Sequence, residues 1–190
     1  DSELYRKHPN WAIKFPKAKP STGRNQMVLD LTNPDVRTFL KTKLREILNS
    51  ATISYIKWDY NRNITDMYGT TLSNQSEFMH RYILGLYDVL QYLTTTFPQV
   101  LFEGCASGGN RFDLGMLCFF PQIWTSDNTD YVERLAIQTG TSYGYPLSVI
   151  SNHVSTVPNH QTLRTTPLSS RFNLACFGVL GYELNLCEED

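Results

Sequence analysis

The sequence predicts an α/β protein built on a parallel sheet. Six segments rich in β-forming residues alternate with amphipathic helical segments along the 190 residues. The unusual polar residues gather directly after the predicted strands, where parallel α/β proteins place their functional sites. A closed barrel and an open doubly wound sheet both fit this alternation. We favour the barrel, because residues from several strand ends would converge at its mouth.

The first strand and helix are predicted within the first quarter of the chain. Residues 1–24 are polar and contain several prolines, so we expect a loop. Residues 26–31 (QMVLDL) are predicted as the first strand because β-formers dominate them. Asn33 and Pro34 form a helix start signal, a capping residue followed by proline at the first helical position. Apolar residues then follow at helical spacing as far as Leu48.

The same alternation continues to the end of the chain. The further strands are expected at residues 53–58, 100–103, 122–125, 147–151 and 179–184. The helices between them are expected at residues 76–96, 112–117, 131–139 and 169–177, the first of them ended by Pro98.

Composition excludes two classes of partner. The formal net charge is −1, and without a basic excess we expect no nucleic-acid partner. No apolar run approaches the roughly 18 residues of a membrane span, and no signal-peptide pattern opens the chain. The abrupt ends at Asp1 and Asp190 indicate a piece excised from a longer protein.

The cysteines indicate a reducing compartment. They are widely spaced and show no C-x-x-C pair, which argues against a zinc ribbon or a redox motif. We therefore predict four free thiols and a cytoplasmic location. The four are Cys105, Cys118, Cys176 and Cys187.

Asp59 is the first candidate catalytic residue. It follows the second predicted strand in YIKWDYNRN, and Lys57, two residues earlier, points to the same side of that strand. A nearby cation favours an ionised carboxylate, the form that a nucleophile at a sugar carbon needs. A structural aspartate that caps the next loop is the alternative. Trp58 and Asn61 alongside favour the functional interpretation.

Asp127 is the second candidate. In WTSDNTD, Asp130 is expected to cap the helix that starts at Tyr131, which leaves Asp127 at the strand end. Asp127 would then lie two strands away from Asp59. Two carboxyls about 5 Å apart across a barrel mouth are typical of retaining glycosidases.

Neither a phosphate site nor a metal site is predicted. The turn GCASGGNRFD lacks the G-x-G-x-x-G and P-loop spacings, so Gly108 and Gly109 are expected to let the backbone pass close to a ligand. His153 and His160 lack metal-ligand spacing, and we predict structural roles for them. No cofactor is expected.

At these residues the sequence resembles glycoside hydrolase family 36, the bacterial α-galactosidases. Six motifs in the right order carry the resemblance over nearly the whole chain: DSELYRKHPNWAI, RNQMVLDLTNPDV, YIKWDYNRN, FEGCASGGNRFDLGML, WTSDNTD and SNHVSTVPNHQTLRTTPL. The resemblance implies a (β/α)8 barrel of which residues 1–190 are a fragment, with the six predicted strands as strands three to eight. An N-terminal β-sandwich, two earlier barrel strands and a C-terminal β domain would lie outside it.

The resemblance also implies residue roles. Asp59 matches the nucleophile and Asp127 the general acid/base of a reaction that retains configuration through a galactosyl-enzyme intermediate. The implied substrate contacts are Arg24, Lys57, Asn61, Cys105, Ser107 and Gly108. No metal is implied.

The implied activity is hydrolysis of terminal α-1,6-galactosides such as melibiose and raffinose, by a homo-oligomeric parent protein. An α-N-acetylgalactosaminidase or a galactosyl-transferring enzyme of the same family is an alternative, although the Cys-x-Ser-Gly-Gly loop favours galactose. A further alternative is a non-catalytic fragment with a sugar-binding or structural role. The two missing strands carry half of the family's sugar contacts and would leave strand edges unpaired, so the isolated fragment is expected to have weak or no activity.

Overall fold

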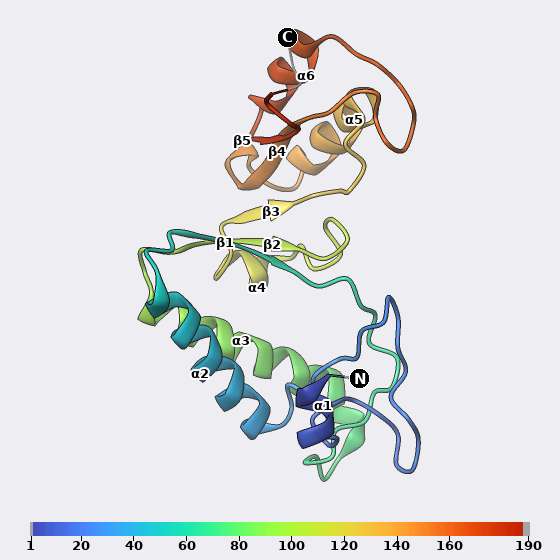
Figure 1. Ribbon diagram of the computed structural model, residues 1–190, viewed down its shortest axis with the longest axis vertical. Helices are drawn as coiled ribbons and strands as arrows, with labels where there is room; N and C mark the ends of the chain where they lie inside the picture. Colours follow the sequence, from blue (N-terminus) through green and yellow to red (C-terminus); the bar gives the residue numbers. More distant parts are fainter. Residues whose placement is uncertain (1, 188–190) are drawn as a thin grey trace. The chain divides into compact units, whose positions relative to one another are not determined.

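A computed structural model describes residues 2–187, which form two compact units. Within the described residues, unit 1 comprises 2–54 and 61–100, and unit 2 comprises 55–60 and 101–187. All the strands belong to unit 2 (Figure 1).

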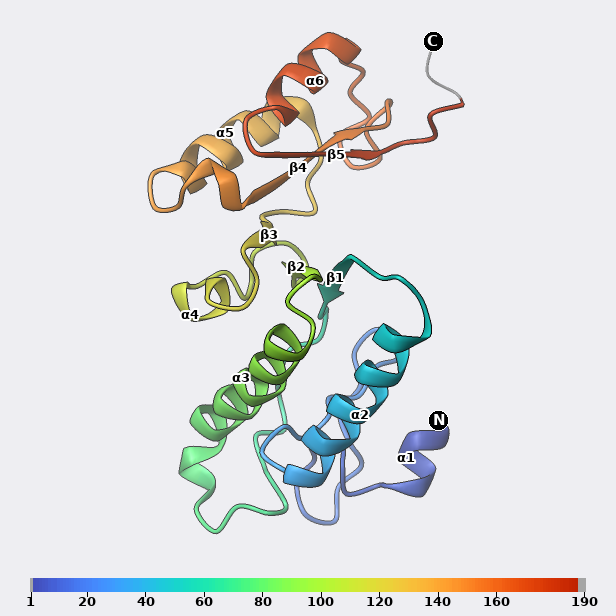
Figure 2. The same ribbon diagram turned by 90° about the vertical axis from the view of Figure 1, so that its left-hand side faces the viewer.

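Unit 1 is built around two long helices. Its elements are α1 (Glu3–Lys7), α2 (Pro34–Ser50), the short 3-10 helix η1 (Gln75–Glu77) and α3 (Phe78–Thr96). Helices α2 and α3 lie side by side (Figures 1 and 2). The predicted start of α2 is confirmed, because the Asn33 side chain accepts a hydrogen bond from the Asp35 N–H at 2.9 Å and Pro34 takes the first helical position.

The predicted strand at residues 26–31 is wrong. Its extended backbone pairs locally instead: Ile13 N–H donates to the Val28 carbonyl at 2.8 Å, and Asp30 N–H donates to the Trp11 carbonyl at 2.7 Å. These residues form only two isolated antiparallel bridges, Ala12 to Leu29 and Gly23 to Gln26. The sheet in the described residues therefore has five strands rather than six. Helix α1 also lies in a region expected to be loop.

Unit 2 contains the sheet. Its strands are β1 (Tyr55–Asp59), β2 (Leu101–Cys105), β3 (Gln122–Trp124), β4 (Ile150–Ser155) and β5 (Val179–Glu183). All neighbours are parallel and follow one another in chain order. A doubly wound sheet reverses its strand order at a switch point, whereas a barrel does not. The topology is thus that of a partial α/β barrel.

The helices of unit 2 connect these strands. They are α4 (Leu114–Leu117), α5 (Tyr131–Ser142), the 3-10 helix η2 (Leu147–Val149) and α6 (Leu168–Ala175). Helix α6 packs against both α5 and β4 (Figure 2). One strand is displaced from its prediction, because residues 147–149 form η2. Asn152 and His153, expected after this strand, consequently lie inside β4.

The two faces of the sheet differ in polarity. Residues paired across parallel strands share a face, and every second residue along a strand joins them. One face is apolar and buried: it carries Phe102, Ile123, Ile150 and Val154. The opposite face carries Lys57, Asp59, Glu103, Cys105, Gln122, Trp124, Ser151, His153 and Glu183. This polar face contains most of the candidate site.

Candidate functional site

The two candidate catalytic carboxylates occupy the carboxyl ends of strands in one sheet. Asp59 is the last residue of β1 and pairs in register with Cys105 of β2. Asp127 lies in the loop between β3 and α5. Both side chains are exposed, and β2 lies between their two strands. The strand-end position predicted for Asp59 is confirmed, whereas Asp127 lies three residues beyond the end of β3.

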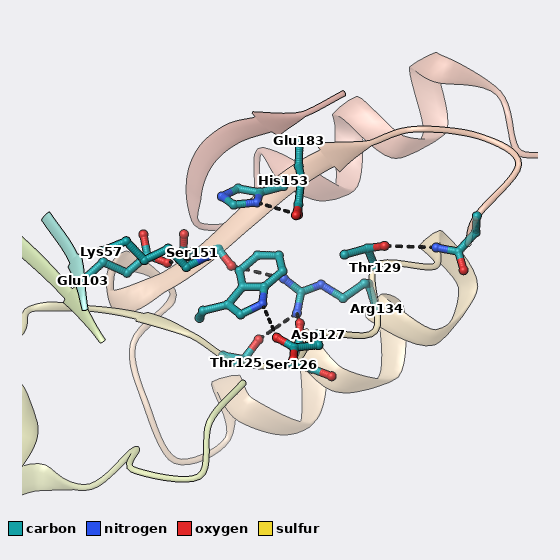
Figure 3. A network of polar contacts seen from close by, with 12 residues as sticks. Lys57, Glu103, Thr125, Ser126, Asp127, Thr129, Arg134, Ser151, His153 and Glu183 are labelled. Atoms are coloured by element: carbon teal, nitrogen blue, oxygen red, sulfur yellow. Dashed lines mark hydrogen bonds and ion pairs between the residues drawn. The ribbon is translucent and has the colours of Figure 1, made fainter. Parts of the chain in front are cut away.

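Trp124 contacts Asp127 directly. The indole Nε1–H donates a hydrogen bond to Asp127 Oδ1 at 3.0 Å (Figure 3). Trp124 is 3% exposed, and His153 stacks on its ring with centroids 4.4 Å apart. No motif in the sequence indicates this contact.

Lys57 lies beside a buried glutamate that the sequence analysis missed. Its Nζ is 3.6 Å from Glu103 Oε1 and 4.6 Å from the centroid of the Trp124 ring. Glu103 is completely buried, and Tyr55 and Gln122 donate hydrogen bonds to its carboxyl. Burial raises the pKa of Glu103 to about 7, against the opposing effect of its hydrogen bonds. A glutamate inside a strand of otherwise buried residues is the signal that would have revealed it.

The loop after β2 is tightly packed. Ser107 and Gly108 both have positive φ, of 50° and 86°. Gly109 N–H donates to the Thr125 carbonyl at 3.0 Å, and a Cβ on Gly108 would lie 2.7 Å from the Ser126 Cα. The close approach that these glycines allow is therefore to the chain's own backbone, next to Asp127.

Cys105 ends β2 with a buried thiol. Burial and the neighbouring Asp59 carboxylate raise the pKa of this thiol to about 11, so it is protonated at neutral pH. A neutral thiol beside a carboxylate suits hydrogen bonding rather than nucleophilic attack. All four cysteines are free, as predicted.

A sequence model described as Melibiase matches residues 1–190. The chain belongs to the Melibiase family. The α-galactosidase 1 of Pediococcus pentosaceus is 51% identical over 190 residues, which is 99% of this chain and 26% of that protein. The crystal structure of the α-galactosidase from Lactobacillus brevis matches with a TM-score of 0.97 at 51% identity, covering 100% of this chain and 26% of that chain.

A structure of a variant of the GH36 α-galactosidase AgaA from Geobacillus stearothermophilus, in complex with raffinose, matches with a TM-score of 0.97 at 48% identity. The match covers 100% of this chain and 27% of that one. The resemblance to family 36 is thereby confirmed. This Melibiase chain spans about a quarter of the length of these relatives.

Asp130 anchors the motif that follows β4 in this Melibiase chain. It caps α5 as predicted, accepting from the N–H groups of Val132 and Glu133. It also accepts from Thr162 Oγ1 at 2.6 Å and forms an ion pair with Arg164. Burial opposes its ionisation, but these partners outweigh burial and lower the pKa of Asp130. The loop at residues 156–167 is thus tied to the loop that carries Asp127.

The remaining candidates belong to unit 1 or lie in other parts of unit 2. Arg24 and Asn61 belong to unit 1, where Arg24 is exposed with φ of 50° and Asn61 is half-buried. His153 places Nδ1 3.2 Å from Glu183, and its burial lowers its pKa. His160 is exposed.

Residues 2–187 show neither a metal-binding cluster nor a membrane-spanning helix. They contain no group of three His, Cys, Asp or Glu side chains that could hold a metal ion. None of the helices in that range has the length and apolar character needed to cross a membrane.

Proposed function

We propose that this chain is part of the catalytic barrel of a retaining α-galactosidase. The supporting observation is the placement of two exposed carboxylates, Asp59 and Asp127, at strand ends of one parallel sheet. Membership of the Melibiase family supports the substrate class. The rest of the barrel and the flanking β domains would be supplied by the protein at its full length, and the 190 residues alone are expected to turn over weakly or not at all.

The proposed reaction is a double displacement. Asp127, as the acid, protonates the glycosidic oxygen while the Asp59 carboxylate attacks the anomeric carbon, which forms a galactosyl ester and releases the leaving group. Asp127, now ionised, removes a proton from water, and the water oxygen attacks the anomeric carbon, which breaks the bond to Asp59, releases galactose and regenerates the Asp59 carboxylate. Two inversions give net retention.

The proposed substrates are α-galactoside oligosaccharides with terminal α-1,6-linked galactose, such as melibiose and raffinose. Solved relatives hold raffinose and stachyose, which supports this class. We propose that Lys57, Cys105, Ser107 and Gly108 contact the galactose, and the same role is predicted for Arg24 and Asn61. An N-acetylgalactosaminide would need extra room at C2 of the sugar. The free cysteines support a cytoplasmic location, and a homo-oligomeric state remains a prediction.

The test is release of nitrophenol from an aryl α-galactoside by the full-length protein and its variants. Asp59→Ala is expected to lose at least about 10³-fold in kcat, because no covalent intermediate can form. Added azide should restore turnover to this variant and yield β-galactosyl azide, since azide attacks from the vacated face. With Asp127→Ala, azide should intercept the galactosyl ester and yield α-galactosyl azide. The two products assign the two roles separately.

Asp35→Asn provides the matched control, because Asp35 is an exposed carboxylate in the first turn of α2. It is expected to retain wild-type turnover. Higher rates on the aryl N-acetylgalactosaminide would favour the alternative substrate. Galactose binding by calorimetry without turnover of any aryl glycoside would contradict the enzymatic proposal and favour a sugar-binding role.

A further inference from the structure

The Trp124 ring is surrounded by three polar side chains from three elements. Lys57 Nζ of β1 lies 4.6 Å from the ring centroid, the Arg134 guanidinium of α5 lies 4.4 Å from it, and the His153 ring of β4 stacks on it at 4.4 Å. Cation–π and stacking contacts depend on orientation. The three side chains therefore bury the indole ring and also fix its orientation.

Arg134 is itself rigidly held. It is 4% exposed, and it donates hydrogen bonds to Thr125 Oγ1 at 2.9 Å, to the Ser126 carbonyl at 3.3 Å and to the Ser151 carbonyl at 3.1 Å. Burial lowers its pKa to about 10, so it stays charged at neutral pH. One guanidinium thereby joins the two residues between Trp124 and Asp127 to the backbone of β4.

Asp127, by contrast, is exposed and lies in a loop. An exposed carboxylate without an oriented partner samples several rotamers. A general acid must bring its proton within hydrogen-bond distance of the leaving oxygen, and small errors in placement are costly in rate. The Nε1–H donor at 3.0 Å supplies such an orientation.

We propose that Trp124 is the positioning residue of the acid/base, and that its indole N–H holds Asp127 Oδ1 so that Oδ2 carries the transferred proton. The inference rests on the proposed function of Asp127. An indole nitrogen donates and does not accept, so Trp124 cannot relay protons and acts only through the geometry of the carboxyl group. Lys57, a proposed galactose contact, lies over the same ring, so the sugar site and the acid/base share this one side chain.

The test is Trp124→Phe in the full-length protein, because phenylalanine keeps an aromatic ring and removes the N–H. Two substrates are compared: raffinose, whose leaving group needs protonation, and dinitrophenyl α-galactoside, whose leaving group departs without it. We expect kcat/KM for raffinose to fall by at least about tenfold, part of the 10²- to 10⁴-fold contribution of general acid catalysis. For the dinitrophenyl substrate it should change by less than about threefold. Azide should raise kcat on the dinitrophenyl substrate, because water attack also needs Asp127.

A role in packing alone would not distinguish the substrates, so equal losses on both would overturn the inference, as would no loss on either. Trp11→Phe, the same substitution in unit 1, is the control and should leave both rates unchanged. Asp127→Ala is measured in parallel. If it shows no selectivity between the substrates, the proposed function of Asp127 has failed; if it is selective and Trp124→Phe is not, only the positioning role has failed.

If Trp124→Phe does not fold, a second variant tests the same inference. Arg134→Lys retains the positive charge and the indole N–H but loses the guanidinium fork that holds the ring. We expect kcat/KM to fall less than in Trp124→Phe, and to fall more for raffinose than for the dinitrophenyl substrate. A uniform loss would overturn it.

Discussion

The backbone N–H of Gly109 donates a hydrogen bond to the carbonyl of Thr125, with 3.0 Å between nitrogen and oxygen. This bond joins the loop after β2 to the loop that carries Asp127. Between the two, Gly108 leaves no room for a side chain, because an added Cβ would lie 2.7 Å from the Ser126 Cα. The position of Asp127 therefore depends on residues around 108 that are distant in sequence.

Gly108→Ala is expected to destabilise the protein and lower its activity together. The backbone at this position has φ of +86°, which L side chains rarely adopt, and the clash is with backbone that cannot rotate away. We expect a loss of about 2 kcal/mol or more in unfolding free energy, with reduced kcat/KM on an aryl α-galactoside. Denaturant unfolding and initial rates measure the two effects.

Gly144→Ala is the control, because nothing lies within 4 Å of a Cβ there. Its stability should stay within about 0.5 kcal/mol of wild type, as for ordinary surface substitutions. Equal behaviour of the two alanine variants would contradict the tight packing of the loop.

Asp130→Ala tests the anchor of the loop at residues 156–167. The substitution removes the cap of α5 and the acceptor of Thr162, and it leaves Arg164 without its carboxylate. A lost cap costs about 0.5–2 kcal/mol, and the half-exposed Arg164 adds little beyond that. With the lost Thr162 hydrogen bond included, we expect a total of roughly 1–3 kcal/mol, together with faster proteolysis of the loop.

The comparison variant is Asp113→Ala. Asp113 is an exposed residue that caps only the four-residue helix α4 through Met116 N–H at 2.9 Å. Its loss should cost less than about 1 kcal/mol and leave proteolysis of residues 156–167 unchanged. A larger effect at Asp113 than at Asp130 would show that the loop anchor is unimportant.

Local chemistry explains which parts of the fold could be predicted. The caps Asn33 and Asp130 and the apolar periodicity of α3 involve neighbours within four residues, so sequence spacing contains the necessary information. Residues 26–31 have the composition of a strand, but composition does not identify a partner. Their backbone pairs with Trp11 and Ile13 rather than with the sheet.

The same distinction applies to the site. Asp59 and Asp127 could be predicted because strand ends are where parallel sheets expose polar residues. Glu103 and its partners Tyr55 and Gln122 are brought together from three strands, up to 67 residues apart, by a register that the sequence does not display. The Trp124–Asp127 contact spans only three residues, but it depends on the conformation of an irregular loop.

Glu103→Gln tests the buried carboxyl through the pH dependence of stability. Burial raises the pKa of Glu103 from its ordinary 4.5 to about 7. Between pH 4.5 and about pH 7, the Glu103 carboxyl therefore stays protonated in the folded protein but ionises in the unfolded chain. Stability should therefore fall as pH rises from about 4.5 to about 7 and level off above it, by roughly 3 kcal/mol. Glutamine keeps the volume and an oxygen acceptor but does not titrate, so the variant should lose this part of the pH dependence.

The measurement compares the unfolding midpoints of the two proteins at pH 5, 6, 7 and 8. Glu46→Gln, on the exposed side of α2, is the control and should keep the wild-type curve. If the curves of wild type and Glu103→Gln run parallel, Glu103 does not change its protonation across this range, and its pairing with Lys57 outweighs burial.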